Sequence, residues 1–287
     1  YPPGGYTSTI ASGTTLTVPS AGTLNLTDGY VDTGNIDAYG NINLASTFDG
    51  GTATLNITGT ANQTLTGGGS ATAGDFLALN INKTAGTLTL TSTIRTGRNW
   101  TYTAGTIDAG TSTVVFAIRS LTITGSHTLN NVTFYSAVTY TITQGTTLTV
   151  NGTLNLTDGY VNTGAIAAKG DINVAATADN GNATITLNGT STQLITCSGV
   201  APGGHLTNTL NINNSSGVVT ITGNVRLHNI NLQVGTLTFL GGATYTIDDA
   251  DAITTSAGTT INFSGSSGSL VTLRSDTTAQ WDLKVNA

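Results

Sequence analysis

The sequence predicts an all-β protein, a right-handed parallel β-solenoid, from its composition, its alternating short runs and an internal repeat. Thr supplies 61 of the 287 residues and Gly supplies 37, whereas Met and Glu are absent and Lys occurs three times. Strong helix formers are therefore scarce, and β-branched and turn-forming residues dominate. No stretch of ten residues has the 3.6-residue apolar period of an amphipathic helix.

An internal repeat of about 130 residues organises the chain. The segment Gly22–Ile36 reads GTLNLTDGYVDTGNI and Gly152–Ile166 reads GTLNLTDGYVNTGAI, so thirteen of fifteen positions are identical at an offset of 130. The match continues to Leu79 and Leu210, at an offset of 131. We therefore expect one continuous solenoid with three parts: an N-terminal lead and assembly segment, 1–18; a first superrepeat, 19–148; and a second superrepeat with a C-terminal assembly segment, 149–287.

Short alternating runs such as Leu24-Asn-Leu and Leu88-Thr-Leu place an aliphatic side chain on one face and Thr or Asn on the other. This is the period of a half-buried strand, and Gly-rich turn signals separate the runs at intervals of about 7 to 12 residues. Coils of roughly 18–25 residues would give about a dozen turns, stacked along one axis. Tandem β-sandwiches are the alternative architecture for so many short strands.

Charge and hydropathy exclude several partners. Charged residues make up 8% of the chain, the net charge is −6, and the eight cations form no basic patch, so we expect no nucleic-acid binding. No run of eighteen apolar residues exists, so we expect no membrane insertion. The chain begins at Tyr1 without Met, so we interpret it as a mature, processed or excised segment and expect it to be exported. The single Cys197 excludes an intramolecular disulfide and, with Gly67 as its repeat counterpart, is expected to fill space.

Three runs carry a resemblance to a known class of protein: GTTLTVNGTLNLTDG at 145–159, NINKTAGTLTLTSTI at 80–94 and SLVTLRSDTTAQWDLKV at 269–285. The sequences of these runs resemble those of large repetitive bacterial cell-surface and adhesin-type β-strand-repeat proteins. The resemblance covers most of the chain and implies export, a β-solenoid and a role at the cell exterior. It brings no catalytic residues with it.

Repeated acidic residues are expected at coil corners. Asp28 and Asp158 occupy equivalent positions in Thr-Asp-Gly-Tyr. A carboxylate for metal or sugar is one interpretation. The repetition favours a corner in which Asp accepts a backbone N–H and Gly29 or Gly159 adopts positive φ.

The densest acidic cluster, in the run TIDDADA, has no counterpart in the first superrepeat. It contains Asp248, Asp249 and Asp251, and clustered carboxylates with nearby carbonyls suit Ca²⁺. The run lacks EF-hand spacing and GGxGxD repeats, so a solvated loop is the competing interpretation. Ca²⁺ is the one cofactor that the sequence suggests.

The sequence does not predict an enzyme. Polysaccharide hydrolases and lyases need carboxylates at defined separations, and His127, His205 and His228 stand in no recognisable catalytic motif. Arg95 and Arg226 are repeat-equivalent, which suggests a stacking or ion-pair role. Thr-x-Thr pairs raise ice binding as an alternative, but they alternate with Asn-x-Asn pairs, which favours ordinary polar ladders. Aromatic residues could stack on sugars or fill coil corners: Tyr30, Tyr39, Trp100, Tyr102, Tyr135, Tyr140, Tyr160 and Trp281.

The function that these observations favour is that of a structural subunit in an extracellular filament or surface fibre. Neither end offers a capping helix, so we expect head-to-tail assembly by strand addition between copies of the chain. Tyr1, Tyr6, Trp281 and Val285 are the expected interface residues. The alternative is a monomeric adhesin or carbohydrate-binding stalk, a segment of a larger surface protein whose partners would be surface glycans.

Overall fold

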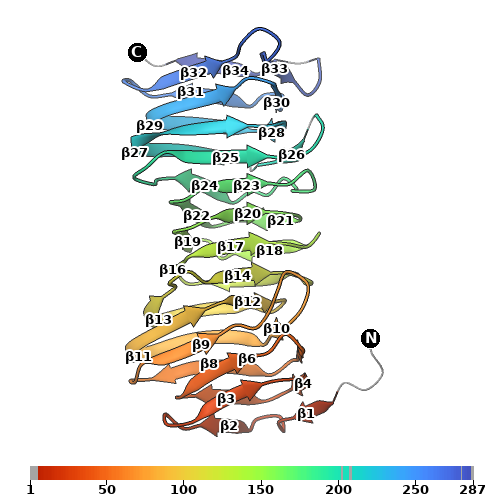
Figure 1. The fold of residues 1–287 in the computed structure, drawn as a ribbon, viewed down its shortest axis with the longest axis vertical. Helices are drawn as coiled ribbons and strands as arrows, with labels where there is room; N and C mark the ends of the chain where they lie inside the picture. Colours follow the sequence, from red (N-terminus) through yellow and green to blue (C-terminus); the bar gives the residue numbers. More distant parts are fainter. Residues whose placement is uncertain (1–5, 202, 207–208, 279, 286–287) are drawn as a thin grey trace. The chain divides into compact units, whose positions relative to one another are not determined.

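A computed structural model of the chain describes residues 6–201, 203–206, 209–278 and 280–285, and these contain β-strands and no helix. They form two compact units, residues 1–146 and 147–287. Figure 1 shows the strands of each unit stacked as successive coils, from red to yellow-green in the first unit and from green to blue in the second.

The strands of the first unit are β1 (Thr7–Thr9), β2 (Thr15–Val18), β3 (Thr23–Leu26), β4 (Gly29–Asp32), β5 (Asn35–Ala38), β6 (Asn41–Leu44), β7 (Phe48–Gly50), β8 (Thr54–Gly59), β9 (Gln63–Thr66), β10 (Asp75–Phe76), β11 (Ala78–Thr91), β12 (Thr93–Thr96), β13 (Trp100–Asp108), β14 (Thr113–Phe116), β15 (Leu121–Thr124), β16 (His127–Leu129), β17 (Asn131–Phe134) and β18 (Thr139–Ile142). The strands of the second unit are β19 (Thr147–Val150), β20 (Leu154–Leu156), β21 (Tyr160–Asn162), β22 (Ala165–Ala168), β23 (Ile172–Val174), β24 (Thr184–Leu187), β25 (Gln193–Cys197), β26 (Gly204–His205), β27 (Thr209–Thr222), β28 (Val225–Leu227), β29 (Asn229–Leu240), β30 (Ala243–Ile247), β31 (Ala252–Thr255), β32 (Thr260–Ser264), β33 (Val271–Ser275) and β34 (Asp282–Val285).

Parallel pairing between successive coils builds both units. In the first unit Thr15 pairs with Asn35 and Asn35 with Thr54, so the chain returns to the same place with each coil. In the second unit Ala165 pairs in the same way with Thr184, one coil later. The parallel β-solenoid is thereby confirmed, with about 12 turns. Tandem sandwiches are excluded, because they are built from antiparallel strands.

Inward-facing side chains stack in columns that run from coil to coil. In one column of the first unit, Leu16 pairs with Ile36, Ile36 with Leu55, Leu55 with Leu79 and Leu79 with Trp100. The last four side chains are at most 2% exposed, whereas Leu16, in the first coil of the column, is 49% exposed. Burial of each apolar side chain therefore depends on having a coil on both sides.

The outward faces carry ladders of amides and hydroxyls. Asn56 Nδ2 donates to Asp37 Oδ1 at 2.8 Å, and Asn80 Nδ2 donates to Asn56 Oδ1 at 3.3 Å. In the second unit Asn231 Nδ2 donates to Asn211 Oδ1 at 3.0 Å. Hydrogen bonds of this kind contribute about 0.5–1.5 kcal/mol each. The ladders therefore make the solenoid faces polar without many charges.

The sequence repeat is also a repeat of structure. Strands β11 and β27 both have 14 residues and the same order of buried, half-buried and exposed positions. At the predicted corners Gly29 N donates to Asp28 Oδ1 and Gly159 N to Asp158 Oδ1, each at 2.8 Å. Gly29 has φ +69°, and a Cβ there would lie 2.0 Å from the carbonyl oxygen of Tyr6. The corner role of these aspartates is thus confirmed.

A buried network of hydrogen bonds, made by the side chains of Gln63 and Lys83, joins three coils at one corner of the first unit. We call this network the polar lock. Gln63 Nε2 donates to the carbonyl oxygens of Ala38 and Gly40, at 2.9 and 2.8 Å. Lys83 Nζ donates to Gln63 Oε1 and, at 2.8 Å, to the carbonyl oxygen of Ala61. Lys83 and Gln63 are each 2% exposed, so the ammonium group is buried among neutral acceptors.

The second unit builds the same lock with a neutral donor. Gln193 Nε2 donates to the carbonyl oxygens of Ala168 and Gly170, at 3.0 and 2.7 Å. Asn214 Nδ2 donates to Gln193 Oε1 at 2.9 Å and to the carbonyl oxygen of Ser191 at 2.7 Å. Asn214 therefore takes the place of Lys83.

The lock predicts a difference between two substitutions of Lys83. Lys83→Met would leave the buried Gln63 Oε1 without its donor, and we expect a loss of about 1–3 kcal/mol in the free energy of unfolding. Lys83→Asn supplies an amide N–H donor, as Asn214 does in the second unit. It also removes the buried ammonium group of Lys83, whose pKa is lowered by burial. We expect it to lose less. Urea unfolding followed by circular dichroism at pH 7 measures the free energy of unfolding of both variants. Equal losses of this free energy in the two variants would contradict the proposed role of the polar lock.

His127 is a second buried titratable group in the first unit. Its Nδ1 lies 2.7 Å from the carbonyl oxygen of Gly125, and its ring stacks on those of Tyr102 and Trp100, with centroids 5.3 and 6.2 Å away. Its Nε2 is buried and has no hydrogen-bond partner among the described residues. Burial lowers the pKa of His127, because it removes water from the charged form, whereas the hydrogen bond with the carbonyl oxygen of Gly125 raises it.

This environment predicts a loss of stability in acid. The unfolded chain takes up a proton on His127 near its ordinary pKa of about 6.5, whereas the folded chain takes it up only at lower pH. Stability from this group is complete above pH 6.5 and is lost as the pH falls below it. His127→Asn keeps a donor near Gly125 and cannot titrate, so its melting temperature should fall less between pH 7 and pH 5. If the melting temperatures of the two proteins fell equally between pH 7 and pH 5, His127 would not be the cause of the loss of stability.

Candidate functional site

The acidic cluster of the second unit lies in the turn after β30, beside the turn after β28. Asp248 N donates to the carbonyl oxygen of Leu227 at 3.0 Å, which places Asp248 next to His228 in the preceding coil. His228 Nδ1 lies 3.0 Å from Asp251 Oδ2 and 3.2 Å from Asp248 Oδ2. Two of the three predicted Ca²⁺ ligands therefore face one imidazole.

The third predicted ligand, Asp249, is held by a different set of groups. Its carboxylate accepts hydrogen bonds from the hydroxyl groups of Ser275 and Thr277, and its backbone N donates to Asp276 Oδ1 at 3.1 Å. The side-chain bonds hold the pKa of Asp249 below its ordinary value. Ca²⁺ binding by Asp248, Asp249 and Asp251 stays a prediction.

Two histidines that the sequence left without a motif meet beside this cluster. His205 Nδ1 lies 3.3 Å from His228 Nε2, and the rings are stacked with centroids 5.6 Å apart. His205 lies in β26, which pairs with β28 through His205 and Arg226. One ligand atom from each of His205, His228 and Asp248 lies within 4.8 Å of the others. Three successive coils thus contribute to one site.

Charged neighbours surround the histidine pair. Arg226 donates to Asp276 Oδ2 at 3.0 Å and lies 3.4 Å from Asp248 Oδ1. Burial lowers the pKa of His205, and Arg226 and His228 lower it further, whereas Asp248 and Asp179 raise it. The predicted ion-pair role of Arg226 is confirmed.

The first unit builds the equivalent corner without histidine. There Asp75 pairs with Arg95 across β10 and β12, and the two side chains form an ion pair. The register of β12 with β14 puts Gly97 in the place of His228 and Ala117 in that of Asp248. Alignment of the two superrepeats would have revealed these replacements from sequence.

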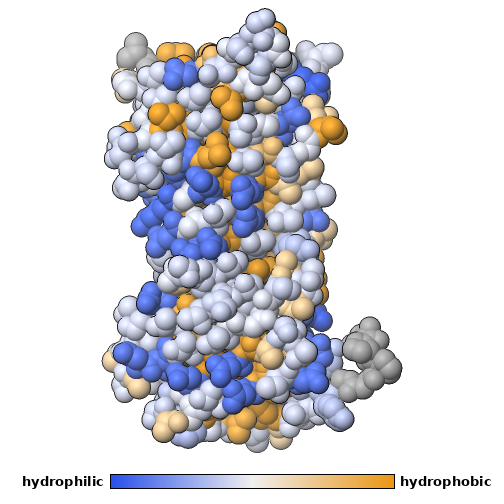
Figure 2. Space-filling model, in the orientation of Figure 1, coloured by the Kyte–Doolittle hydropathy of each residue, from blue (hydrophilic) through white to orange (hydrophobic). Residues whose placement is uncertain are grey.

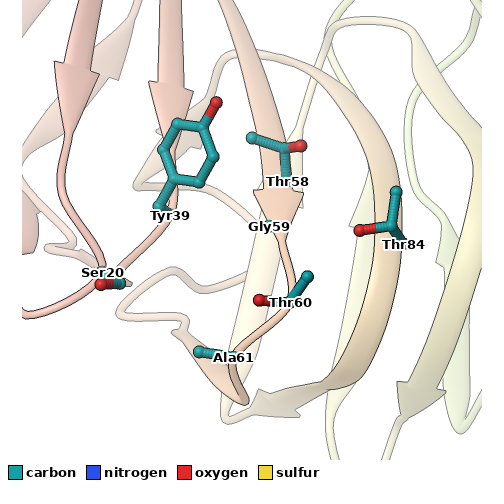
Figure 3. Close-up of a pocket in the computed structure, with 7 residues that line it drawn as sticks. All are labelled: Ser20, Tyr39, Thr58, Gly59, Thr60, Ala61 and Thr84. Carbon is teal, nitrogen blue, oxygen red and sulfur yellow. The ribbon is translucent and has the colours of Figure 1, made fainter.

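A surface pocket of about 430 Å³ lies at a corner of the first unit, within the range of small-molecule sites. Its lining residues are Ser20, Tyr39, Thr58, Gly59, Thr60, Ala61 and Thr84. Figure 3 shows Ser20 and Tyr39 on one side of the end of β8 and Thr84 on the other. A Cβ on Gly59 would lie 2.9 Å from Tyr39 Cδ1, so glycine lets the backbone lie against the ring.

The second unit keeps Gly59 and Thr60 of the pocket, as Gly189 and Thr190, but changes other lining residues. Lys169 takes the place of Tyr39 at an offset of 130. The segment Val18–Gly22, which contains Ser20, is also longer than its counterpart Val150–Gly152. An aromatic ring with hydroxyl groups around it is therefore specific to the first unit.

The predicted assembly residues lie in the first and last described coils, apart from Tyr1, which lies outside the described residues. Tyr6 is 81% exposed and precedes β1. Val285 is 70% exposed at the end of β34, and Trp281 is half-buried just before that strand. Their role in assembly stays a prediction.

Cys197 lies at the end of β25, in the core of the second unit. It is 7% exposed, and burial raises the pKa of its thiol to about 12. A thiol with so high a pKa is a poor nucleophile, which agrees with the predicted space-filling role.

No protein-family model, curated protein or solved structure matches the chain. The described residues include no helix long and apolar enough to cross a membrane.

Proposed function

We propose that this chain is a structural subunit of an extracellular filament or surface fibre, and that copies assemble head-to-tail. The observation that carries the proposal is the exposure of inward-facing apolar side chains in the first and last described coils. The role is mechanical and needs no catalytic step. The low charge and the resemblance to bacterial cell-surface repeat proteins support a place outside the cell.

Identical sequence gives different burial in the two units. Leu16 lies in Thr-Leu-Thr-Val of β2 and is 49% exposed, whereas Leu148, in the same four-residue sequence of β19, is fully buried. In the last coils, Phe263 stacks on Phe239 with centroids 5.5 Å apart. Phe263 is 48% exposed and Phe239 is fully buried. The space-filling view shows hydrophobic surface in coils throughout both units, the N-terminal coils of the first and the C-terminal coils of the second among them (Figure 2).

A second copy of the chain suits these surfaces. Each exposed coil offers strand edges and apolar columns that already stack on a neighbouring coil of similar pattern. A contact between two different ends does not close on itself, so it propagates as a fibre. If the natural chain continues, further coils would cover the same surfaces, and the protein would be a stalk.

Substitution of the end coils tests the assembly. Leu16→Asp and Phe263→Asp place a charge in a column that the next subunit would bury, where each side chain contributes about 1.5–3 kcal/mol. We expect at least about tenfold weaker association for either variant. We would measure the association by light scattering after size exclusion and by negative-stain electron microscopy, both across a dilution series.

Val200→Asp is the matched control, because Val200 is 86% exposed and lies outside the end coils. It should assemble as the unchanged protein does. Monomers at every concentration of the unchanged protein would overturn the filament. Fibres that form equally well with Asp at position 16 or 263 would remove the end coils from the interface.

The pocket of the first unit favours carbohydrate binding as a second candidate function. Tyr39 offers an apolar ring face beside the hydroxyl groups of Ser20, Thr58, Thr60 and Thr84. Sugars present both apolar ring faces and hydroxyl groups, and an aromatic ring with a polar rim matches both. This chemistry belongs to an adhesin or a carbohydrate-binding stalk.

Glycan binding should depend on Tyr39. Tyr39→Lys installs the residue of the second unit and removes the stacking face. Signals on a glycan array should therefore fall by up to about tenfold, because an aromatic contact contributes up to about 1.5 kcal/mol. Tyr160→Ala is the control, since Tyr160 is a 45% exposed tyrosine of the second unit. Binding that survives Tyr39→Lys, or no binding to any glycan, would rule out the pocket.

A further inference from the structure

We infer that His205, His228 and Asp248 form a binding site for a divalent transition-metal ion of the Zn²⁺ class. The site is separate from the proposed assembly surfaces and from the Tyr39 pocket. It also differs in chemistry from a Ca²⁺ site, because two of its three ligands are imidazole nitrogens.

The distance between the two imidazoles fits a shared metal ion. Zn–N bonds of 2.0–2.1 Å in a tetrahedron separate two ligand nitrogens by about 3.3–3.4 Å. His205 Nδ1 and His228 Nε2 are 3.3 Å apart. Without a metal ion, two neutral imidazoles can form one N–H···N hydrogen bond between these nitrogens. A metal cation between the rings would instead be bound by the lone pairs of both nitrogens.

The surroundings orient the ligands as metal sites require. Asp251 Oδ2 lies 3.0 Å from His228 Nδ1. In the tautomer in which Nδ1–H donates a hydrogen bond to this carboxylate, the lone pair of Nε2 is free for a metal ion. Asn229 Nδ2 donates to the other oxygen of Asp251 and holds that carboxylate in place. His228 is 6% exposed, so its ring is fixed by packing as well. Two imidazoles and a carboxylate leave a fourth position open to water.

The charges around the site favour a cation. Four carboxylates lie in this corner, from Asp248, Asp249, Asp251 and Asp276. Arg226 lies against two of them, 3.4 Å from Asp248 Oδ1 and 3.0 Å from Asp276 Oδ2. Asp248 Oδ2 lies 3.2 Å from His228 Nδ1, and one carboxylate oxygen of Asp248 lies within 4.8 Å of a ring nitrogen of each histidine.

The solenoid does not need these side chains for its own packing. The first unit forms the same ladder of β10, β12 and β14 with Asp75, Gly97 and Ala117 in the equivalent places. The second unit replaces all three with residues that ligate transition metals. A core requirement would have produced the same residues in both units.

The test is titration of the full chain with ZnCl₂, followed by calorimetry and by the melting temperature, with CaCl₂ in a parallel series. We expect one Zn²⁺ per chain, a higher melting temperature that EDTA reverses, and no such response to Ca²⁺. CoCl₂ supplies a spectroscopic readout, since tetrahedral Co²⁺ gives intense visible d–d bands.

Three variants separate the site from adventitious binding. His205→Asn and Asp248→Asn each remove one ligand and should abolish the Co²⁺ bands, and Asp251→Asn should weaken binding about 10–100-fold. His205 is half-buried, so its variant should fold even if substitutions at His228 do not. His127→Asn, at the remaining histidine, should bind Zn²⁺ as the unchanged chain does.

Absence of Zn²⁺ binding would overturn the proposal. So would binding that persists in His205→Asn, because the ion would then be held elsewhere. If the chain responded to Ca²⁺ and not to Zn²⁺, the carboxylates of the cluster would be the ligands, and the histidines would not take part in binding.

Discussion

Burial of each inward side chain by the coil before it and the coil after it is the constraint on which this structure depends. A strand of four residues buries little by itself, so the free energy of burial comes from columns such as Leu16, Ile36 and Leu55. The coil with no neighbour on one side keeps part of its apolar surface in water, as the half-exposed Leu16 does. The same constraint that builds the core therefore creates the surface from which we infer assembly.

Coil corners are free of that constraint, and the two units differ at several of them. A corner must reverse the chain and satisfy its backbone groups, which Asp28 with Gly29 and Asp158 with Gly159 do in the same way. Beyond that need, a corner side chain can change without disturbing the columns. Lys169 in the place of Tyr39, and Asn214 in the place of Lys83, are such changes. The two ligand sites that we propose, at Tyr39 and at His205, both lie at corners.

The sequence could predict the solenoid because its signals are local and repeated. Alternating Thr and Leu specify strands, and the repeat specifies that coils stack. The sequence could not bring His205, His228 and Asp248 together, because each comes from a different coil, and a coil length has to be known before their spacing means proximity. Coil lengths vary, and the repeat offset shifts by one position near His205, which hides the register. The sequence indicates Tyr39 as a possible sugar-stacking residue, but it does not predict the pocket, because the lining residues come from successive coils.

The two equivalent corners differ in how their charges are balanced. In the first unit Arg95 meets Asp75, one cation against one carboxylate, in a buried pair that is neutral by itself. In the second unit Arg226 meets two carboxylates at once, from Asp248 and Asp276, while Asp251 faces an imidazole. Like charges gathered at a partly buried corner raise the free energy of the folded state unless a cation neutralises them. A metal ion held between coils would relieve that repulsion and join β26, β28 and β30, as the lock of Gln193 and Asn214 joins coils elsewhere in the unit.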